Sequence, residues 1–491
     1  MVDPARQAAY EAIAAVHRDD AYANLALPQI LRELRLGGRD AAFATELTYG
    51  TLRVSGTLDA IIAAAADRDV SRIDPPARDA LRLGAYQLLQ MRVPAHAAVA
   101  STVDLVRAVA GPAATGFANA VLRRIGARSW DEWIAEVAPD READPLGYLA
   151  VAYAHPPWIT RAFAEGLHGD LAGTEALLAA DNVPAPVHLC ARPGRIDRDE
   201  LAAQVGGEPG RYSPFAVYLP GGAPGDLPAI ADGRAHVQDE GSQLVALALA
   251  NAELTNAELT GPELTGREPA ELSDGAAAGG AAAAGGAAAG GAAGGGAASG
   301  PDARWLDLCA GPGGKAALLG ALAAQRGAEV TAVEIAPHRA ALVEQAVRGL
   351  PVTVVCADGR EFEETGFDRV LVDAPCSGLG SLRRRPESRW RRQPSDLPPL
   401  TRLQRELLIA AIRAVRPGGL VGYVTCSPHL VETQVTVTEA ARRSPYPVEL
   451  VDARPALPDG LPELGTGPSV QLWPHRHGTD AMFLALLRRT G

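Results

Sequence analysis

The chain has 491 residues and a net charge of −12, and 47% of its residues are hydrophobic while 21% are charged. This length exceeds one ordinary core and predicts two to three domains, and the composition excludes a chain that is disordered throughout. The acidic balance argues against a generic polyanion binder, although a local basic face stays compatible with nucleic-acid binding. No apolar run approaches the roughly 18 residues that span a bilayer, and residues 1–7 show no signal-peptide pattern.

The five cysteines lie at positions 190, 309, 356, 376 and 426. Five cysteines in a chain of this length do not make a disulfide framework, and none are paired with the CxxC spacing of a zinc site. We therefore expect a cytoplasmic protein that holds no metal and does not contact a membrane.

Residues 4 to about 128 are predicted to be helical, because Ala, Leu and Arg dominate and apolar side chains recur at intervals of three and four. Glycine and proline interrupt this pattern at Gly37-Gly38, Asp74–Pro76, Val93-Pro94 and Gly111-Pro112. We expect a bundle of several short helices, and we assign residues 1–140 to an all-α domain.

Several runs in this region are more specific than composition: Tyr22–Leu27, Arg39–Phe43, Leu47–Arg53, Leu81–Leu89 and Phe117–Arg124. Together they resemble the NusB family of helical RNA-binding antitermination proteins, over about a quarter of the chain. The candidates for phosphate contact are Arg6, Arg53, Arg123 and Arg124, although a solvated or ion-paired arginine is the favoured reading of each one singly.

Residues 145–235 differ in character and are assigned to a small α+β (RRM-like) domain. Short strands are predicted at 187–192 and 216–219, with a helix at 197–205 between them. His155 and Trp158 are candidates for RNA contact, but packing is the favoured role of Trp158. A helix is predicted at 236–250.

Residues 251–302 are interpreted as a flexible low-complexity insertion. Asn-Ala-Glu-Leu-Thr occurs twice from position 251, and an almost pure Ala/Gly tract follows at 275–299. A five-residue period matches neither helix nor strand, and the tract has no side chains to bury. A partner-docking role is an alternative without support.

The remaining chain shows a doubly wound α/β pattern, and we assign residues 236–491, interrupted by the insertion, to a Rossmann-like domain. Strands are predicted at 304–308, 329–335, 352–356, 369–372 and 420–425. A glycine-rich turn, Cys309–Lys315, follows the first strand and leads into a helix at 316–325. This turn is neither GxGxxG nor a Walker loop, because no Ser or Thr follows Lys315.

Acidic residues stand near the ends of four successive strands: Asp307, Glu334, Asp358 and Asp373. An acid at the tip of the second strand can hold ribose hydroxyls, and glycines after the first strand let the backbone approach a ligand. Four such acids suit a ligand with a ribose, an adenine amine and a cationic centre. The pattern therefore predicts S-adenosyl-L-methionine as the cofactor.

Four motifs are more specific still: Asp307–Lys315, Asp373–Gly378, Thr425–Ser427 and Leu472–Asp480. With the NusB-like region, they resemble the RsmB (Fmu/Sun) family of 16S rRNA 5-methylcytosine methyltransferases, over nearly the whole chain apart from the insertion. Two departures are visible. Val431–Thr433 stands where the family usually has Glu-Glu-Asn, which affects a secondary polar contact, and Ala481–Phe483 replaces Gly-Phe-Phe, which is interpreted as a change in strand packing.

The resemblance implies a role for each matching residue. Cys309, Ala310, Gly311, Pro312, Gly313, Gly314 and Lys315 line the cofactor, Glu334 holds its ribose, Asp358 reaches its adenine amine, and Asp373 lies between cofactor and base.

The chemistry requires a thiolate, because C5 of cytosine becomes nucleophilic only after a thiolate adds at C6. The resemblance assigns this attack to Cys426 and product release to Cys376. In the DNA-type enzymes the cysteine of the Pro-Cys motif attacks instead, which leaves Cys376 as the alternative nucleophile. Asp373 would stabilise the adduct or supply a proton, and Lys315 would orient these groups or serve the cofactor turn.

A basic run follows the second motif directly. Six arginines stand against one glutamate, with a tryptophan among them, which favours phosphate contact and base stacking over a merely solvated face. The candidates are Arg383, Arg384, Arg385, Arg389, Trp390, Arg391 and Arg392.

The sequence thus predicts a monomeric methyltransferase that forms 5-methylcytosine in a single-stranded or loop region of 16S rRNA. One alternative is the same chemistry on tRNA. The other is a non-catalytic RNA-binding or antitermination protein, against which the intact Cys376, Cys426 and Lys315 argue.

Overall fold

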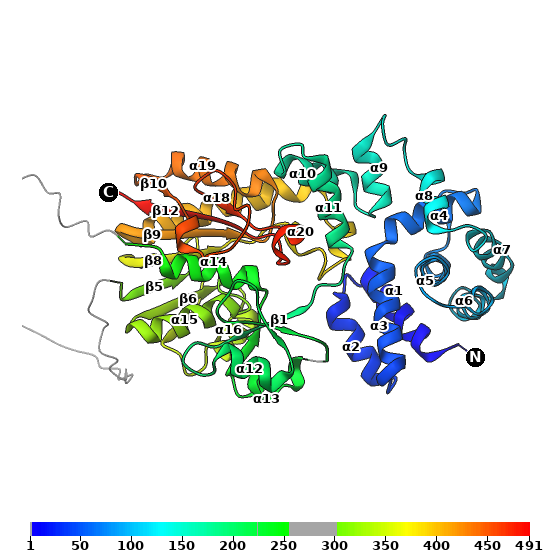
Figure 1. The fold of residues 1–491 in the computed structure, drawn as a ribbon, viewed down its shortest axis with the longest axis horizontal. Coiled ribbons are helices and arrows are strands. Elements are labelled where there is room, and N and C mark those ends of the chain that lie inside the picture. Colours follow the sequence, from blue (N-terminus) through cyan, green and yellow to red (C-terminus); the bar gives the residue numbers. More distant parts are fainter. Residues whose placement is uncertain (1, 223, 255–301) are drawn as a thin grey trace, which may run out of the picture.

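The computed structural model describes residues 2–222, 224–254 and 302–491. Most of the predicted insertion therefore lies outside the described residues. An elongated arrangement is seen in Figure 1, with helices at one end and a large sheet at the other. Among the described residues, no helix combines the length and apolarity needed to cross a membrane.

The N-terminal part is helical, as predicted. Its helices begin or end at the predicted breaks: α3 begins at Gly38, α5 at Pro75 and α6 directly after Pro94. Their buried faces form one core that includes Ile13, Leu47 and Leu81. The helices are α1 (Pro4–Arg18), α2 (Ala23–Glu33), α3 (Gly38–Arg53), α4 (Ser55–Ala66), α5 (Pro75–Leu89), α6 (Ala95–Ala110), α7 (Thr115–Ile125) and α8 (Trp130–Val137).

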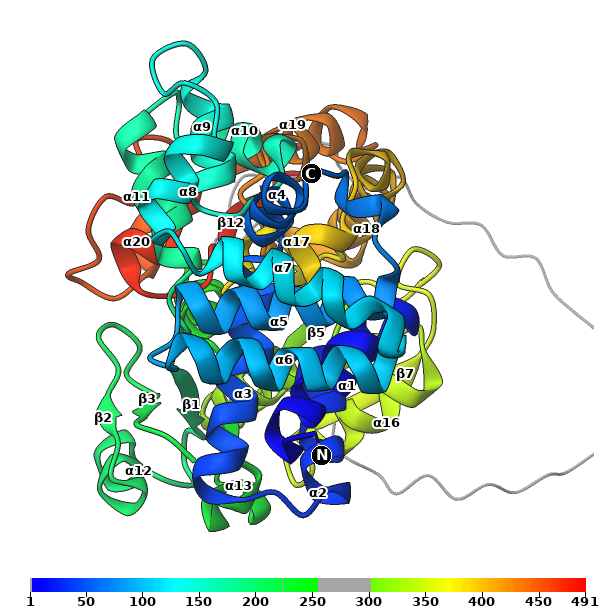
Figure 2. The ribbon, with the colours of Figure 1, turned by 90° about the vertical axis from the view of Figure 1, so that its right-hand side faces the viewer.

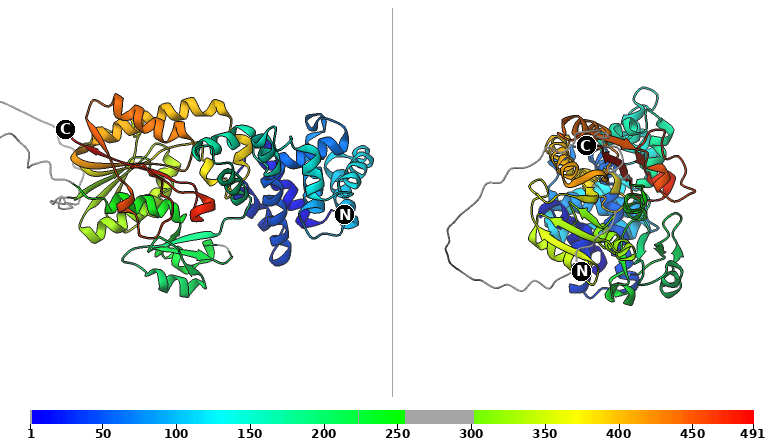
Figure 3. Two further views of the ribbon diagram at one scale, coloured as in Figure 1. Left: turned by 45° about the horizontal axis from the view of Figure 1, so that its top comes forward. Right: turned by 90° about the vertical axis from the view of Figure 1, so that its left-hand side faces the viewer.

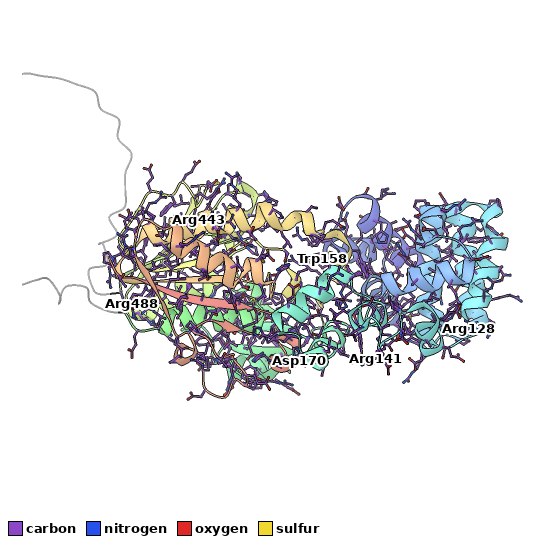
Figure 4. The ribbon with its side chains drawn as sticks, turned by 90° about the horizontal axis from the view of Figure 1, so that it is seen from above. Arg128, Arg141, Trp158, Asp170, Arg443 and Arg488 are labelled. Carbon is purple, nitrogen blue, oxygen red and sulfur yellow. The ribbon has the colours of Figure 1, made fainter. Side chains whose placement is uncertain are left out.

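Three short helices then lead toward the large sheet: α9 (Pro145–Ala152), α10 (Pro157–Gly166) and α11 (Leu171–Asp181). They share a core with Leu379, Leu382 and Trp473 from the C-terminal part. Trp158 packs partly buried against this core, and Figure 4 shows it between the two ends of the molecule. The favoured packing role of Trp158 therefore agrees with its surroundings.

A small four-stranded sheet follows, in the order β2-β3-β1-β4. The left panel of Figure 3 shows it as a separate green lobe beside the large sheet. Its strands are antiparallel, and α12 and α13 pack on them. The bounds are β1 (Val187–Ala191), α12 (Arg198–Val205), β2 (Glu208–Pro209), β3 (Ala216–Leu219), α13 (Pro228–Ala231) and β4 (Ala235–Val237).

The predicted helix at 236–250 is wrong at its start. Residues 235–237 form β4, which pairs with β1 so that Val237 lies opposite Leu189. The helix α14 (Glu240–Asn251) begins after Asp239, whose side chain accepts a hydrogen bond from the Gly241 N–H. Strand pairing thus takes the first residues out of the helix, and the aspartate cap sets its true beginning.

The large sheet has the strand order β10-β12-β9-β8-β5-β6-β7, with β11 paired to β12. The strands β8, β5, β6 and β7 are parallel neighbours, and β12 is antiparallel to β9. The strands are β5 (Arg304–Asp307), β6 (Glu329–Glu334), β7 (Val352–Cys356), β8 (Phe367–Asp373), β9 (Val415–Thr425), β10 (Val448–Val451), β11 (Val470–Gln471) and β12 (Phe483–Arg489).

Helices cover both faces of this sheet. Two apolar cores result, one under α14 and α15 and the other under α18 and α19. Seen from the helical end, α5 and α6 lie in front of the sheet (Figure 2). The remaining helices are α15 (Gly314–Arg326), α16 (Pro337–Ala346), α17 (Ser388–Arg391), α18 (Leu397–Ala414), α19 (Gln434–Arg443) and α20 (Pro474–His477).

Candidate active site

The glycine-rich turn between β5 and α15 is held against the end of β6. The Gly311 N–H donates to Glu334 Oε2 over 3.0 Å, and Arg339 Nη2 donates to the Gly311 carbonyl over 2.7 Å. Gly313 has a φ of +112°, and a Cβ there would lie 2.7 Å from the Cβ of Ala346. Glycine is therefore required at this position, because a side chain would clash and the backbone is in the left-handed region.

The four predicted acids do lie at one edge, because they follow parallel strands. Glu334 is only 4% exposed, and its second oxygen accepts from the Ala336 N–H over 3.0 Å. Asp358 is engaged by Arg360, whose Nη2 donates to its carboxylate over 2.6 Å. The adenine role of Asp358 stays a prediction, since a ligand amine there would share the carboxylate with this guanidinium.

Asp307 was predicted as a strand-end acid without a role of its own. It is fully buried, and its Oδ1 accepts from the Cys309 N–H over 3.3 Å. Its Oδ2 is buried and has no hydrogen-bond partner in the part of the chain that the structure describes. A buried carboxylate oxygen without a donor fits a cationic ligand, so these residues suit the ammonium group of S-adenosylmethionine.

Affinity for S-adenosylmethionine is expected to rise with pH. Burial, and next the charge of Asp373, raise the pKa of Asp307 to about 7, while Lys315 opposes the rise and Glu334 adds to it. The cation binds the ionised carboxylate, so affinity should increase about eightfold between pH 6 and pH 7.5. Calorimetry across this range measures the effect.

The matched control for this titration is Asp307→Asn, which keeps the shape but does not ionise. Its affinity should be lower and nearly constant over the same range. A flat profile in the unaltered protein would show that Asp307 does not face the cation.

A partly buried ion pair stands at the end of β8. Lys315 Nζ donates to Asp373 Oδ2 over 2.7 Å. Burial alone would lower the pKa of Lys315, but the charge and hydrogen bond of Asp373, with Cys426 and Asp307 nearby, raise it overall. Lys315 therefore stays a cation at this edge, where it can stabilise a thiolate or an anionic adduct.

The two motif cysteines meet although they are 50 residues apart in the chain. Their sulfur atoms lie 3.4 Å from each other, Cys376 after β8 and Cys426 after β9. The hydrogen bond with Cys426, then burial, and also the charge of Glu432 raise the pKa of Cys376. Cys376 is thus held as a thiol next to the second sulfur.

The third cysteine at the edge is not suited to attack. Burial, and next the charges of Asp307 and Asp373, raise the pKa of Cys309 well above its usual value. It lies in the glycine-rich turn and remains an uncharged thiol. The structure therefore presents one pair of sulfur atoms for covalent chemistry.

Sequence reasoning left open whether Val431–Thr433 makes a polar contact, and the structure places Glu432 in a buried one. Its carboxylate accepts from the side chains of Ser377 and Ser427, which follow the two motif cysteines. An acid shortly after the Thr-Cys-Ser motif was the only signal for this residue in the sequence.

Most side chains of the basic run 383–392 donate hydrogen bonds inside the protein. Arg389 is fully buried and donates to carbonyl oxygens of Arg53 and Asp181. Trp390 Nε1 donates to the Leu52 carbonyl over 3.2 Å. RNA contact stays a prediction for the whole run. It is favoured at Arg385 and Arg392 over Arg383, Arg384, Arg389, Trp390 and Arg391, because the donors of those five already bond within the protein.

Other candidate contacts to RNA are also engaged. His155 is 2% exposed, and its Nδ1 bonds with the Tyr153 carbonyl. Arg53 is 6% exposed, Arg6 donates to Gln87, and Arg124 donates to the Ala65 carbonyl. These contacts agree with the favoured reading of the arginines, in which each side chain is paired within the protein and does not bind phosphate.

This architecture, a Rossmann-like sheet with a glycine turn, strand-end acids and paired thiols behind a helical domain, defines an S-adenosylmethionine-dependent methyltransferase. The model described as 16S rRNA methyltransferase RsmB/F matches residues 298–488, and the NusB family model matches residues 3–127. The chain belongs to the RsmB/F family of methyltransferases. It is an RNA cytosine-5 methyltransferase that uses S-adenosylmethionine.

Individual relatives match this chain over nearly the full length of both proteins. A putative methyltransferase of Mycobacterium tuberculosis is 53% identical over 489 residues, 99% of this chain and 97% of its own. The ribosomal RNA small subunit methyltransferase B of Pseudomonas putida is 30% identical over 458 residues, 91% of this chain and 90% of its own. The crystal structure of PH0851 has the same fold, with a TM-score of 0.73 at 21% identity over 100% and 99% of the two chains.

Proposed function

We propose that this enzyme methylates C5 of a cytosine in 16S rRNA and that Cys426 forms a transient covalent bond to C6 of the base. The observation that supports it is the pair of sulfur atoms 3.4 Å apart, Cys376 and Cys426, at the same sheet edge as Lys315 and Asp373. A covalent route needs one thiolate to attack and a second group to assist release, and this edge offers both.

Each residue has a distinct task in this proposal. The Cys426 thiolate, near the Lys315 cation, adds to C6 and makes C5 nucleophilic. When bound, S-adenosylmethionine supplies a methyl group on a cationic sulfur. Asp373 faces N3 of the base and stabilises the adduct or supplies a proton. After methyl transfer the C5 proton passes to solvent and the electrons of the C5–H bond form the C5=C6 double bond. The bond between C6 and Cys426 breaks, Cys426 leaves as a thiolate, and the Cys376 thiol assists this release by donating a hydrogen bond to it.

The proposal of 16S rRNA rests on two supports. The Pseudomonas putida relative is named for the small ribosomal subunit, and a NusB-like helical domain precedes the catalytic domain. Bisulfite sequencing of 16S rRNA and tRNA from strains with and without the gene tests it. We expect one methylcytosine of 16S rRNA to be missing in the strain without the gene. A methylcytosine missing only from tRNA would show that tRNA is the substrate instead.

We also propose a cytoplasmic monomer without a metal, with domains at 1–140, 145–235 and 236–491. The target cytosine is single-stranded or in a loop, because it must leave its stack to reach the sulfur pair. Arg385 and Arg392 are the members of the basic run proposed to contact its phosphates.

Replacing Cys376 with alanine is expected to trap the enzyme on RNA. Without the second thiol the adduct should form but break slowly, so a covalent complex should appear as a slow band on a denaturing gel. Cys426→Ala in the same assay is the control, and it should give no band. Normal turnover of Cys376→Ala with no band would remove the release role.

A further inference from the structure

Glu432 is a fully buried carboxylate in the turn that follows β9. It lies outside the cofactor residues and accepts four hydrogen bonds from uncharged donors. Oε1 accepts from the Ser377 N–H over 2.8 Å and from Gln404 Nε2 over 3.0 Å. Oε2 accepts from Ser377 Oγ over 2.5 Å and from Ser427 Oγ over 2.7 Å. A buried carboxylate is costly without such donors, so the four contacts fix it firmly.

The donors come from the two turns that carry the motif cysteines. Ser377 directly follows Cys376, and Ser427 directly follows Cys426. The two serine hydroxyl oxygens also lie 3.1 Å from each other. One carboxylate thus joins the end of β8 to the end of β9 immediately beside the sulfur atoms.

A second residue anchors this link to the helix layer. Gln404, fully buried on α18, donates to Glu432 and also to the Pro375 carbonyl over 2.8 Å. The Tyr423 hydroxyl donates to the backbone carbonyl of Glu432 over 2.7 Å. Glu432 is therefore held by β9 at its backbone and by α18 and the two turns at its carboxylate.

We propose that Glu432 is a positioning residue that keeps the thiols of Cys376 and Cys426 at working distance. It touches neither RNA nor cofactor and acts through Ser377 and Ser427. The inference rests on the proposed covalent function of the two cysteines. Its negative charge also contributes to raising the pKa of Cys376, after the hydrogen bond with Cys426 and burial, which keeps the release group protonated.

The distance between the thiols can be measured without RNA. Diamide oxidises two neighbouring thiols to a disulfide: the sulfurs lose two protons and two electrons, and the N=N bond of diamide takes them up as a hydrazine. Sulfur atoms 3.4 Å apart need to approach to about 2.05 Å, so the unaltered protein should form the Cys376–Cys426 disulfide readily. Peptide mass spectrometry gives the rate, with methyl transfer to RNA measured on the same samples.

Glu432→Ala should slow this disulfide formation about tenfold and reduce kcat about a hundredfold, because small displacements of reacting groups are costly. The KM for RNA and the Kd for S-adenosylmethionine should stay within about threefold, since Glu432 contacts neither. Glu432→Gln should keep both rates within about fivefold, because its amide oxygen can accept from Ser377 while the serine hydroxyls turn to accept from its amide nitrogen. Glu439→Gln removes a charge from the adjacent helix and should change nothing.

An unchanged rate of disulfide formation in Glu432→Ala would overturn the positioning role, whatever happens to methylation. The two proposals can also fail separately. If Glu432→Ala slows disulfide formation but the unaltered protein does not methylate RNA, the proposed function is wrong and the positioning of the two thiols by Glu432 still holds. If Glu432→Ala does not fold, Ser427→Ala removes the hydrogen bond from the Cys426 turn to Glu432, together with the one from the His429 N–H, and keeps both bonds from Ser377 to Glu432. It should slow disulfide formation about threefold, and an unchanged rate there would also overturn the inference.

Discussion

Replacing Cys426 with serine is expected to lower methyl transfer to RNA by at least about a thousandfold. A serine hydroxyl does not ionise near neutral pH, so it cannot add to C6 of the base as a thiolate does. Binding of S-adenosylmethionine should stay within about twofold, because Asp307, Glu334 and the glycine turn do not bond to Cys426. Single-turnover transfer from labelled cofactor measures the first effect, and calorimetry measures the second.

Cys356→Ser is the matched control, because this cysteine is exposed and its sulfur is not near the pair. It should retain nearly full activity. The alternative assignment gives the opposite pattern: if Cys376 attacks, Cys376→Ser abolishes transfer while Cys426→Ser still forms methylcytosine. The two variants together therefore decide which sulfur attacks.

Features set by local sequence could be predicted well. Strands β7 and β3 have the predicted bounds of 352–356 and 216–219, and helices begin at predicted glycine and proline breaks. Apolar runs and breakers act within a few residues, so a single sequence reveals them. The acids at the ends of the strands could be placed at one edge for a different reason, because the carboxyl ends of parallel strands meet at the same edge of a sheet.

Features that depend on a distant partner could not be predicted. The run of arginines has the composition of an RNA-binding face, but the carbonyl oxygens that it meets belong to residues more than 200 positions away, such as Arg53 and Asp181. Composition does not show whether a guanidinium meets a phosphate or a helix end. Strand β4 was mistaken for helix because its three residues are defined by pairing with β1, not by their own pattern.

The segment around the buried Arg389 also joins the helical domain to the part of the chain that follows Cys376. Arg389 Nη1 donates to the Arg53 carbonyl over 3.1 Å and to Asn182 Oδ1 over 2.7 Å, and Nη2 donates to the Asp181 carbonyl over 2.7 Å. Gly56 accommodates the neighbouring Trp390, since a Cβ there would lie 2.1 Å from its ring. One short segment therefore contacts α3, α4 and α11 together.

Arg389→Met is expected to destabilise this junction by about 3 kcal/mol, because it fills similar volume but leaves several buried acceptors without a donor. Burial lowers the pKa of Arg389 to about 10, so the side chain is still charged at neutral pH and its hydrogen bonds are those of a cation. The expected result is a melting temperature lower by several degrees and faster proteolysis between the helical domain and the sheet.

Arg385→Met is the matched control. It removes the same charge four residues before Arg389, but the side chain of Arg385 is exposed. It should leave melting and proteolysis unchanged within error, and by the proposed RNA contact it should weaken RNA binding instead. Equal melting of both variants would mean that the guanidinium of Arg389 does not hold the junction. Because removal of one buried partner costs far more than removal of an exposed charge, the two variants separate a structural arginine from one that is free to meet phosphate.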